Sequence, residues 1–355
     1  MNKGLLEYRA VFILMIFLFH AGVLPIGGTF GVSAFFILSG FCTVLGYRDR
    51  VSQKGFNYLL YLRKRYVKYY PLHWLLLFII LIMEFYRGFS ISNNGLQLAA
   101  NFFLVQSLIP IKDYFFSFNA VSWYLSDTVF FVALAPVILL IFNKFKRGGV
   151  ILLIILSLFA ISLFCWLPKE YIQPIIYINP IVRLSDFVYG VWLAYVYESI
   201  IKSKVVSWVK QVITEHPIIY PILVAVVLCV SIMIYNRIKM VSFLGVIYWL
   251  PCTIILLLCS FCSLNKIGFI GTFGSISFEF FMIHQLCINA FTSMQMAGLF
   301  TINNLYVSVI VEFVIATILA YLLHRFFTKP IVEKLLIKHT RNNTRKTQKY
   351  SEEIS

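Results

Sequence analysis

Residues 9–20 read RAVFILMIFLFH, an unbroken apolar run between one arginine and one histidine. The run belongs to a longer apolar stretch, about 5–25, and a membrane-spanning helix needs roughly 17–25 mostly apolar residues. The stretch carries Arg9 and His20 and lacks a small-residue cleavage site. We therefore expect it to stay in the protein as a membrane helix and not to be removed as a signal peptide.

Further apolar runs of this kind continue along the chain. A shorter run, 96–110, contains Asn101 and Gln106 and stops at Pro110, which favours a re-entrant or surface helix in an outer loop. Glycines and serines between residues 27 and 40 predict close packing of the second span against other helices. The sequence predicts an all-α polytopic membrane bundle of about ten transmembrane helices, at about 5–25, 29–47, 67–86, 122–143, 150–168, 178–198, 217–236, 242–263, 275–293 and 305–327.

Composition and charge agree with a membrane protein and exclude a water-soluble one. Of the 355 residues, 61% are hydrophobic and 12% charged, whereas soluble proteins average about a quarter charged residues. The net charge of +16 falls mainly on one side if the N-terminus is cytoplasmic, as the positive-inside rule requires. We therefore predict cytoplasmic termini, a membrane domain over 1–333 and a basic, flexible tail over 334–355 that touches anionic lipid, with no nucleic-acid partner and no appended soluble domain.

Cysteine usage gives no sign of a metal site. The seven cysteines all lie in apolar runs and are expected to be small buried hydrophobic residues. Cys259 and Cys262 form a lone C-x-x-C without a second pair or a nearby histidine. We therefore expect no bound metal.

Ionisable residues inside membrane spans are costly and mark functional sites by default. Arg9 and His20 are eleven positions apart, close to three helical turns, so they share one helix face about 16 Å apart. Arg183 and Asp186 are three positions apart and can pair, either as a structural ion pair or within a site. Asp127, Glu279 and His284 are further candidates of the same kind.

A basic segment enters the third span as Arg63-Lys64-Arg65-Tyr66-Val67-Lys68-Tyr69-Tyr70-Pro71. Arg65 and Lys68 lie one turn apart and face the same way, a geometry suited to phosphate groups. Ordinary positive-inside anchoring explains the same charges, and on charge alone it is the favoured interpretation.

Seven motifs in order along the chain resemble acyltransferase family 3, membrane proteins that O-acylate bacterial surface glycans. Lys68 replaces the second arginine of one motif, which keeps the charge but loses the bidentate fork. Thr128 stands where a glutamate is common, beside Asp127. The matching stretches are 9–20 (Arg-x10-His), 31–41, 65–71 (Arg-x-x-Arg-x-x-Pro), 123–126 with Pro136 (Trp-x-Leu-Ser…Pro), 180–190, 276–285 and Lys329-Pro330.

The resemblance implies an enzyme that moves an acyl group, expected to be acetyl, from acyl-CoA to a sugar hydroxyl, in the bacterial inner membrane. Acetyl-CoA is expected as a donor substrate, with no bound cofactor and with polysaccharide-assembly proteins as possible partners. A flippase or transporter of lipid-linked glycan is the alternative, although no repeated halves with matching broken helices are found.

The same resemblance assigns roles to the candidate residues. His20 is the expected base and a transient acyl-histidine is the less favoured route; which carboxylate orients His20 (Asp127, Asp186 or Glu279) stays open. The expected catalytic residues are His20, Arg9 and Asp127, the expected donor-binding residues are Arg65, Lys68 and Arg63, and the expected supporting or acceptor-binding residues are Arg183, Asp186, Glu279, His284 and Trp123.

Overall fold

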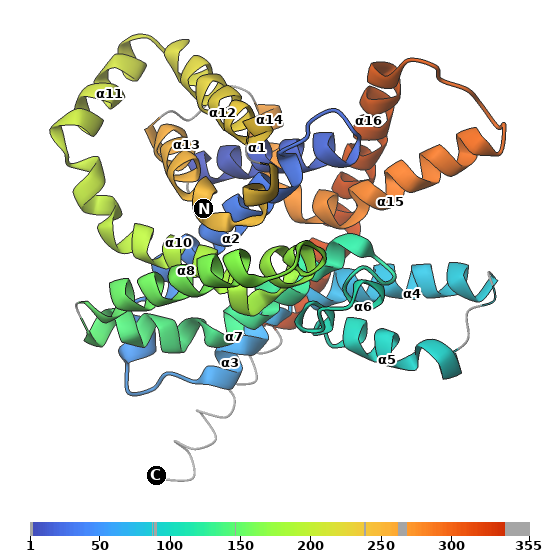
Figure 1. Ribbon diagram of the computed structural model, residues 1–355, viewed down its shortest axis with the longest axis horizontal. Helices are drawn as coiled ribbons and strands as arrows, with labels where there is room; N and C mark the ends of the chain where they lie inside the picture. The colour runs from blue at the N-terminus through green and yellow to red at the C-terminus, as the bar shows by residue number, and fades with distance from the viewer. Residues whose placement is uncertain are drawn as a thin grey trace.

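The computed structural model describes residues 3–86, 88, 91–145, 147–237, 239–261 and 268–337, and these residues form an all-α structure (Figure 1). Most of the predicted tail, from residue 338 onward, lies outside the described residues, as does Cys262. The α-helices are α1 (Lys3–His20), α2 (Gly27–Tyr47), α3 (Tyr58–Tyr66), α4 (Tyr70–Tyr86), α5 (Ile91–Phe102), α6 (Lys112–Phe115), α7 (Trp123–Lys144), α8 (Gly148–Trp166), α9 (Lys169–Tyr171), α10 (Pro180–Ile201), α11 (Lys204–Glu215), α12 (Ile219–Arg237), α13 (Trp249–Phe261), α14 (Gly268–Ser275), α15 (Ser277–Met296) and α16 (Leu305–Leu323).

Each predicted span overlaps an α-helix, but the helix in 242–263, α13, has only 13 residues, and the helices differ in how well they suit a bilayer. Within the described residues, five helices are long and apolar enough to cross a membrane, or six if the bent pair α3–α4 is one span. These five helices are Gly27–Tyr47, Ala120–Lys144, Gly148–Trp166, Ile219–Arg237 and Leu305–Ile337. The protein is therefore a membrane protein, while the count of ten spans and the cytoplasmic termini stay predictions.

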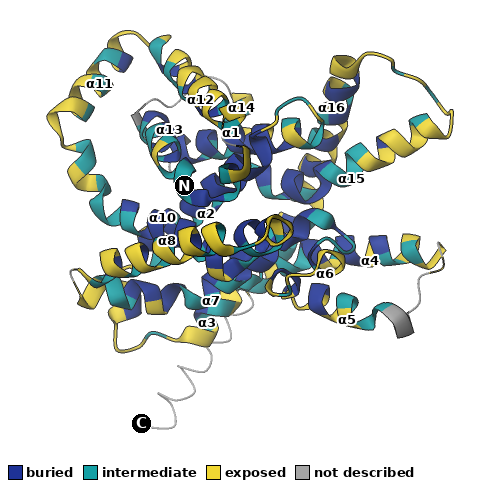
Figure 2. Cartoon of the chain, viewed as in Figure 1, coloured by how far each residue is buried: buried dark blue, intermediate teal, exposed yellow. Residues whose placement is uncertain are grey.

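Burial separates a central group of helices from helices at the lipid-facing edge. Figure 2 shows the buried residues concentrated on α1, α2, α7 and α10, with exposed residues on the outer helices. In α8 and in α12, only 17% of the most apolar 18-residue stretch of the helix is buried inside the protein. Apolar side chains that face outward in this number suit a lipid environment. Cys165 of α8 and Cys229 of α12 are exposed as well, so the expectation of burial is wrong for these two cysteines.

Glycines set the contacts between the central helices. A Cβ added at Gly31 would collide with Ile16 of α1, and one added at Gly40 or Gly190 would overlap a backbone carbonyl across the α2–α10 contact. The backbones approach this closely because these positions have no side chain, which is the packing that small residues give membrane helices. The prediction of close packing for the second span is confirmed.

The shorter apolar run 96–110 folds as the end of a short helix followed by loop and not as a span. α5 has 12 residues and ends at Phe102, which is too short to cross a bilayer core. The backbone carbonyl of Asn101 lies 2.8 Å from Nε2 of His73 on α4. The side-chain amide of Asn101 donates a hydrogen bond to the hydroxyl of Ser117. α4 and α5 project together from the bundle, as α15 and α16 do (Figure 1).

Candidate active site

Two histidines from opposite ends of the sequence meet inside the bundle. His20 is the last residue of α1, and His284 is fully buried on α15. Nε2 of His284 lies 3.1 Å from Nδ1 of His20, and the ring centroids are 4.9 Å apart. His284 is thus the group that contacts the expected base, in a place where the sequence suggested a carboxylate.

Backbone carbonyls fix the tautomers of this histidine pair. Nδ1 of His284 lies 2.7 Å from the carbonyl of Phe281, and Nδ1 of His20 lies 3.0 Å from that of Ile16. A carbonyl only accepts, so both Nδ1 atoms must carry a proton. Nε2 of His284 must then accept from Nδ1–H of His20, because two N–H groups cannot face each other at that distance. In the neutral ring Nε2 of His20 is then the unprotonated nitrogen, which is the state a general base needs.

A cavity of about 470 Å³ opens near the other end of α1. Arg9 of α1 and Glu279 of α15 both line it, so each of these two helices carries residues at the cavity and one histidine of the pair. Phe281 joins the two regions: its side chain lines the cavity and its carbonyl accepts from His284. Neither His20 nor His284 is among the residues that line the cavity, so the cavity lies next to the histidine pair and the two are connected through Phe281.

The cavity is lined by more cations than carboxylates. Its basic residues are Arg9, Arg65, Lys68 and Lys329, with His324 beside them, and its acidic residues are Glu279 and Glu333. Its other lining residues include serines, threonines and the rings of Phe35, Tyr69, Tyr124, Phe278 and Phe281. A cationic, partly aromatic cavity of this kind suits an anionic ligand that also carries apolar surface.

Three polar atoms of the cavity lining are buried and have no protein partner within the described part of the chain. They are Nε of Arg65 and the hydroxyls of Ser277 and Thr328. A buried donor without an acceptor costs about 1–3 kcal/mol. Such donors around one cavity indicate that a ligand with several acceptor atoms completes them.

Glu279 is engaged at the cavity wall and not at His20. Its Oε1 lies 3.0 Å from Nδ1 of His324. His324 begins a π-helical turn, η7 (His324–Thr328), at the end of α16. π-Helical turns often occur at functional sites because the extra residue shifts the register; here the turn brings both His324 and Thr328 to the cavity.

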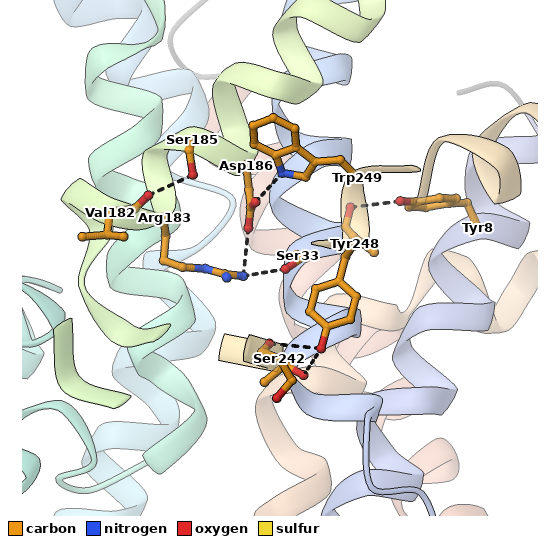
Figure 3. Close-up of polar contacts among 11 residues, drawn as sticks. Tyr8, Ser33, Val182, Arg183, Ser185, Asp186, Ser242, Tyr248 and Trp249 are labelled. Atoms are coloured by element: carbon orange, nitrogen blue, oxygen red, sulfur yellow. Dashed lines mark hydrogen bonds and ion pairs between the residues drawn. The ribbon is translucent and has the colours of Figure 1, made fainter. Parts of the chain in front are cut away.

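Arg183 and Asp186 form a second polar cluster, on the α2–α10 side of the bundle (Figure 3). Nη2 of Arg183 lies 3.0 Å from Oδ2 of Asp186 and donates to Ser33 at 2.9 Å. Nε1 of Trp249 donates to Asp186 at 2.7 Å. The guanidinium also lies over the rings of Phe36 and Tyr177, at 5.2 and 5.6 Å. The cluster ties α10 to α2 and α13, while Nε and Nη1 of Arg183 have no hydrogen-bond partner among the described residues.

Trp123 packs against this second cluster, and Asp127 makes no hydrogen-bonded contact with His20. Both carboxylate oxygens of Asp127 are buried without a hydrogen-bond partner among the described residues, so Asp127 makes no hydrogen bond to His20. The ring of Trp123 packs at 5.0 Å against Tyr177, the residue that covers Arg183. Tyr177 lies in another π-helical segment, η4 (Ile172–Ile178).

A family model described as an acyltransferase domain matches residues 8–325, nearly the whole chain. The chain belongs to the acyltransferase 3 family. No curated protein and no solved structure matches it. The protein is therefore a membrane acyltransferase, and its family assignment gives no support to the transporter alternative.

The acyltransferase gathers only part of the predicted donor-binding set. Arg65 and Lys68 line the cavity. Arg63 lies on another side of α3, in a small depression with Lys64 and Leu336. Helix geometry separates the two sides, because residues 63 and 65 point about 200° apart around the axis.

Sequence reasoning missed several cavity residues of the acyltransferase. Ser277, His324 and Thr328 were not candidates, although Ser277 and Thr328 lie within or beside the late motifs. His284 was a candidate only as a supporting residue, and its contact with His20 spans 264 positions. The spacing of residues along a sequence predicts contacts within one helix, but not a contact between residues this far apart.

Proposed function

We propose that this acyltransferase moves an acetyl group from acetyl-CoA to a sugar hydroxyl of a cell-surface glycan, with His20 as general base. The observation that carries the proposal is the contact between His20 and His284, which leaves Nε2 of His20 as an acceptor. The cationic cavity lies along the same two helices.

The donor is proposed to enter the cavity with its phosphates against Arg65, Lys68 and Arg9. These side chains offer charge-assisted hydrogen bonds, which are about twice as strong as neutral ones. The buried and unpartnered Nε of Arg65 supports this placement, since a phosphate oxygen would complete it. The acyl arm would then follow α1 from Arg9 toward His20, a rise of about 16 Å over eleven residues.

The transfer requires one base and one leaving thiolate. The acceptor oxygen bonds to the thioester carbonyl carbon while Nε2 of His20 takes the hydroxyl proton. The carbon–sulfur bond then breaks, and the departing thiolate receives that proton from His20. The products are the O-acetyl ester and CoA with a free thiol.

The acceptor is proposed to approach from the end of α1 that carries His20. The helix ends there, and the chain turns at Gly22, whose φ of 76° is left-handed. With a cytoplasmic N-terminus, this end faces outward across the bacterial inner membrane, where lipid-linked or growing polysaccharide and its assembly proteins are found. Arg183, Asp186, Asp127 and Trp123 are proposed to support the helices around the site.

Acyl transfer by the purified protein tests the proposal. The full chain in lipid nanodiscs is given acetyl-CoA and a panel of glycan acceptors, and CoA release and sugar O-acetylation are measured together. We expect both products with wild type and at least a 100-fold loss with His20→Gln, since a positioned base contributes about 10²–10⁴-fold. His73→Gln, another buried membrane histidine, is the control. Full activity of His20→Gln would overturn the assignment of the base.

A further inference from the structure

The cavity has polar donors on two separate sets of elements. One set, Arg65 and Lys68, comes from α3 and the turn before α4. The other, Ser277, Thr328 and Lys329, comes from the start of α15 and the end of η7. The proposed function uses the first set for the donor phosphates and leaves the second without a role.

The second set is built as a binding site. Ser277 is 1% exposed and Thr328 is 7% exposed, and neither hydroxyl has a partner within the described residues. Both line the cavity together with Lys329. Ser277 is the first residue of a 20-residue helix, whose N-terminus carries a positive partial charge. Two buried hydroxyls, an ammonium and a helix N-terminus together suit an anion.

The carboxylates of the cavity do not cancel this charge. Glu279 lies 3.0 Å from His324, so its charge is directed to that ring. Glu333 is exposed, and solvent and salt screen an exposed charge. Lys329 lies at the same exposed edge, where it can reach the anion from the mouth of the cavity.

The two sets lie within reach of one ligand. Tyr69 follows Lys68 and Phe278 follows Ser277, and their ring centroids are 5.8 Å apart. A nucleotide with phosphate groups at two positions of one ribose fits donors placed on both sides of such a contact. CoA has this arrangement, with a diphosphate at the 5′ position and a monoester at the 3′ position.

We propose that Ser277, Thr328 and Lys329 form a subsite for the 3′-phosphate of a free CoA thioester, an inference that rests on the proposed donor. The subsite makes the enzyme selective for CoA over donors that lack this phosphate, such as 3′-dephospho-CoA or a phosphopantetheine arm. Ser277 and Thr328 are specificity-determining residues under this proposal, and they take no part in the transfer itself.

Binding of CoA and 3′-dephospho-CoA to the full-length protein in nanodiscs, measured by calorimetry, tests the subsite. Hydrogen bonds to a charged group predict about tenfold tighter binding of CoA by wild type. The Ser277→Ala/Thr328→Val double variant should lose most of this preference and keep its affinity for 3′-dephospho-CoA within about twofold. Its fold should be unaffected, because neither hydroxyl has a partner to lose among the described residues.

Thr317→Val is the matched control, because this hydroxyl bonds to the carbonyl of Phe313 within α16 and does not line the cavity. The control should keep the wild-type preference. Equal affinity of wild type for the two ligands, or an equal loss for both in the double variant, overturns the subsite and leaves the proposed function standing. Absence of binding of either ligand to wild type overturns both.

Discussion

Nε2 of His284 accepts from Nδ1 of His20 at 3.1 Å, and the carbonyl of Phe281 holds His284 in the tautomer that makes this possible. The arrangement resembles the buried partner that orients the histidine in hydrolytic triads, with a neutral imidazole in place of a carboxylate. A neutral partner avoids placing an uncompensated charge in the membrane interior. The same contact fixes the orientation of His20 at the end of α1.

His284 should act through His20, and substitution of His284 tests this. His284→Phe removes the acceptor and should lower kcat about 100-fold with little change in the KM for acetyl-CoA. His284→Gln retains an oxygen that can accept from Nδ1–H and should recover part of the rate. Steady-state kinetics on both variants measures the change in kcat separately from the change in KM. Equal loss in both variants, or a loss confined to KM, would contradict a positioning role.

Arg65 and Lys68 should determine donor affinity while Arg63 should not. Arg65→Gln or Lys68→Gln removes a charge from the cavity and should raise the KM for acetyl-CoA about tenfold, more at low ionic strength than at high. Arg63→Gln leaves the cavity lining intact and should change KM less than about twofold. Steady-state kinetics at two salt concentrations compares the KM for acetyl-CoA of the three variants. A larger effect from Arg63 than from Arg65 would place the donor elsewhere.

Arg183 should stabilise the fold through its contacts with Asp186 and Ser33. Arg183→Ala leaves Asp186 buried without its cation, and breaking a buried pair costs about 3–5 kcal/mol. We expect a large fall in Tm and in detergent-extracted yield, with partial recovery in Arg183→Ala/Asp186→Asn. Thermal unfolding in detergent measures both. An unchanged Tm in the single variant would show that the pair is not structural.

The α2–α10 contact should tolerate no side chain at Gly40. Gly40→Ala places a Cβ against the carbonyl of Phe187 and should lower Tm and activity, because the backbones must separate. Gly46→Ala, on the same helix with open space around it, should keep or slightly raise Tm, since alanine favours helix by about 1 kcal/mol. A lower Tm for Gly46→Ala than for Gly40→Ala would contradict this packing.

The positions of the helices were predictable because apolar runs of the right length are read directly from sequence. The cationic side of the site was also predictable in part: Arg9 and His20 share a helix face by their spacing, and Arg65 and Lys68 both reach the cavity. Arg63 was expected at the donor because of its charge, but the direction of its side chain around the helix axis places it on the other side of α3.

The partner of His20 was not predictable for a physical reason. Carboxylates usually orient catalytic histidines, so three were candidates, but packing decides which side chain lies near His20. Close contact at glycines such as Gly31 brings α1 against α2, and α15 then packs along α1. Ser277 and Thr328 were overlooked because a serine or threonine is informative only when burial leaves it without a partner.

The tautomer of His20 tests the central claim most directly. ¹⁵N-histidine NMR on the purified protein at neutral pH, with the His20 signals assigned by their loss in His20→Gln, reports which ring nitrogen carries the proton. The contact with His284 and the carbonyl of Ile16 predict a protonated Nδ1 and an unprotonated Nε2. A proton on Nε2 and none on Nδ1 would contradict the proposed base and its orientation by His284.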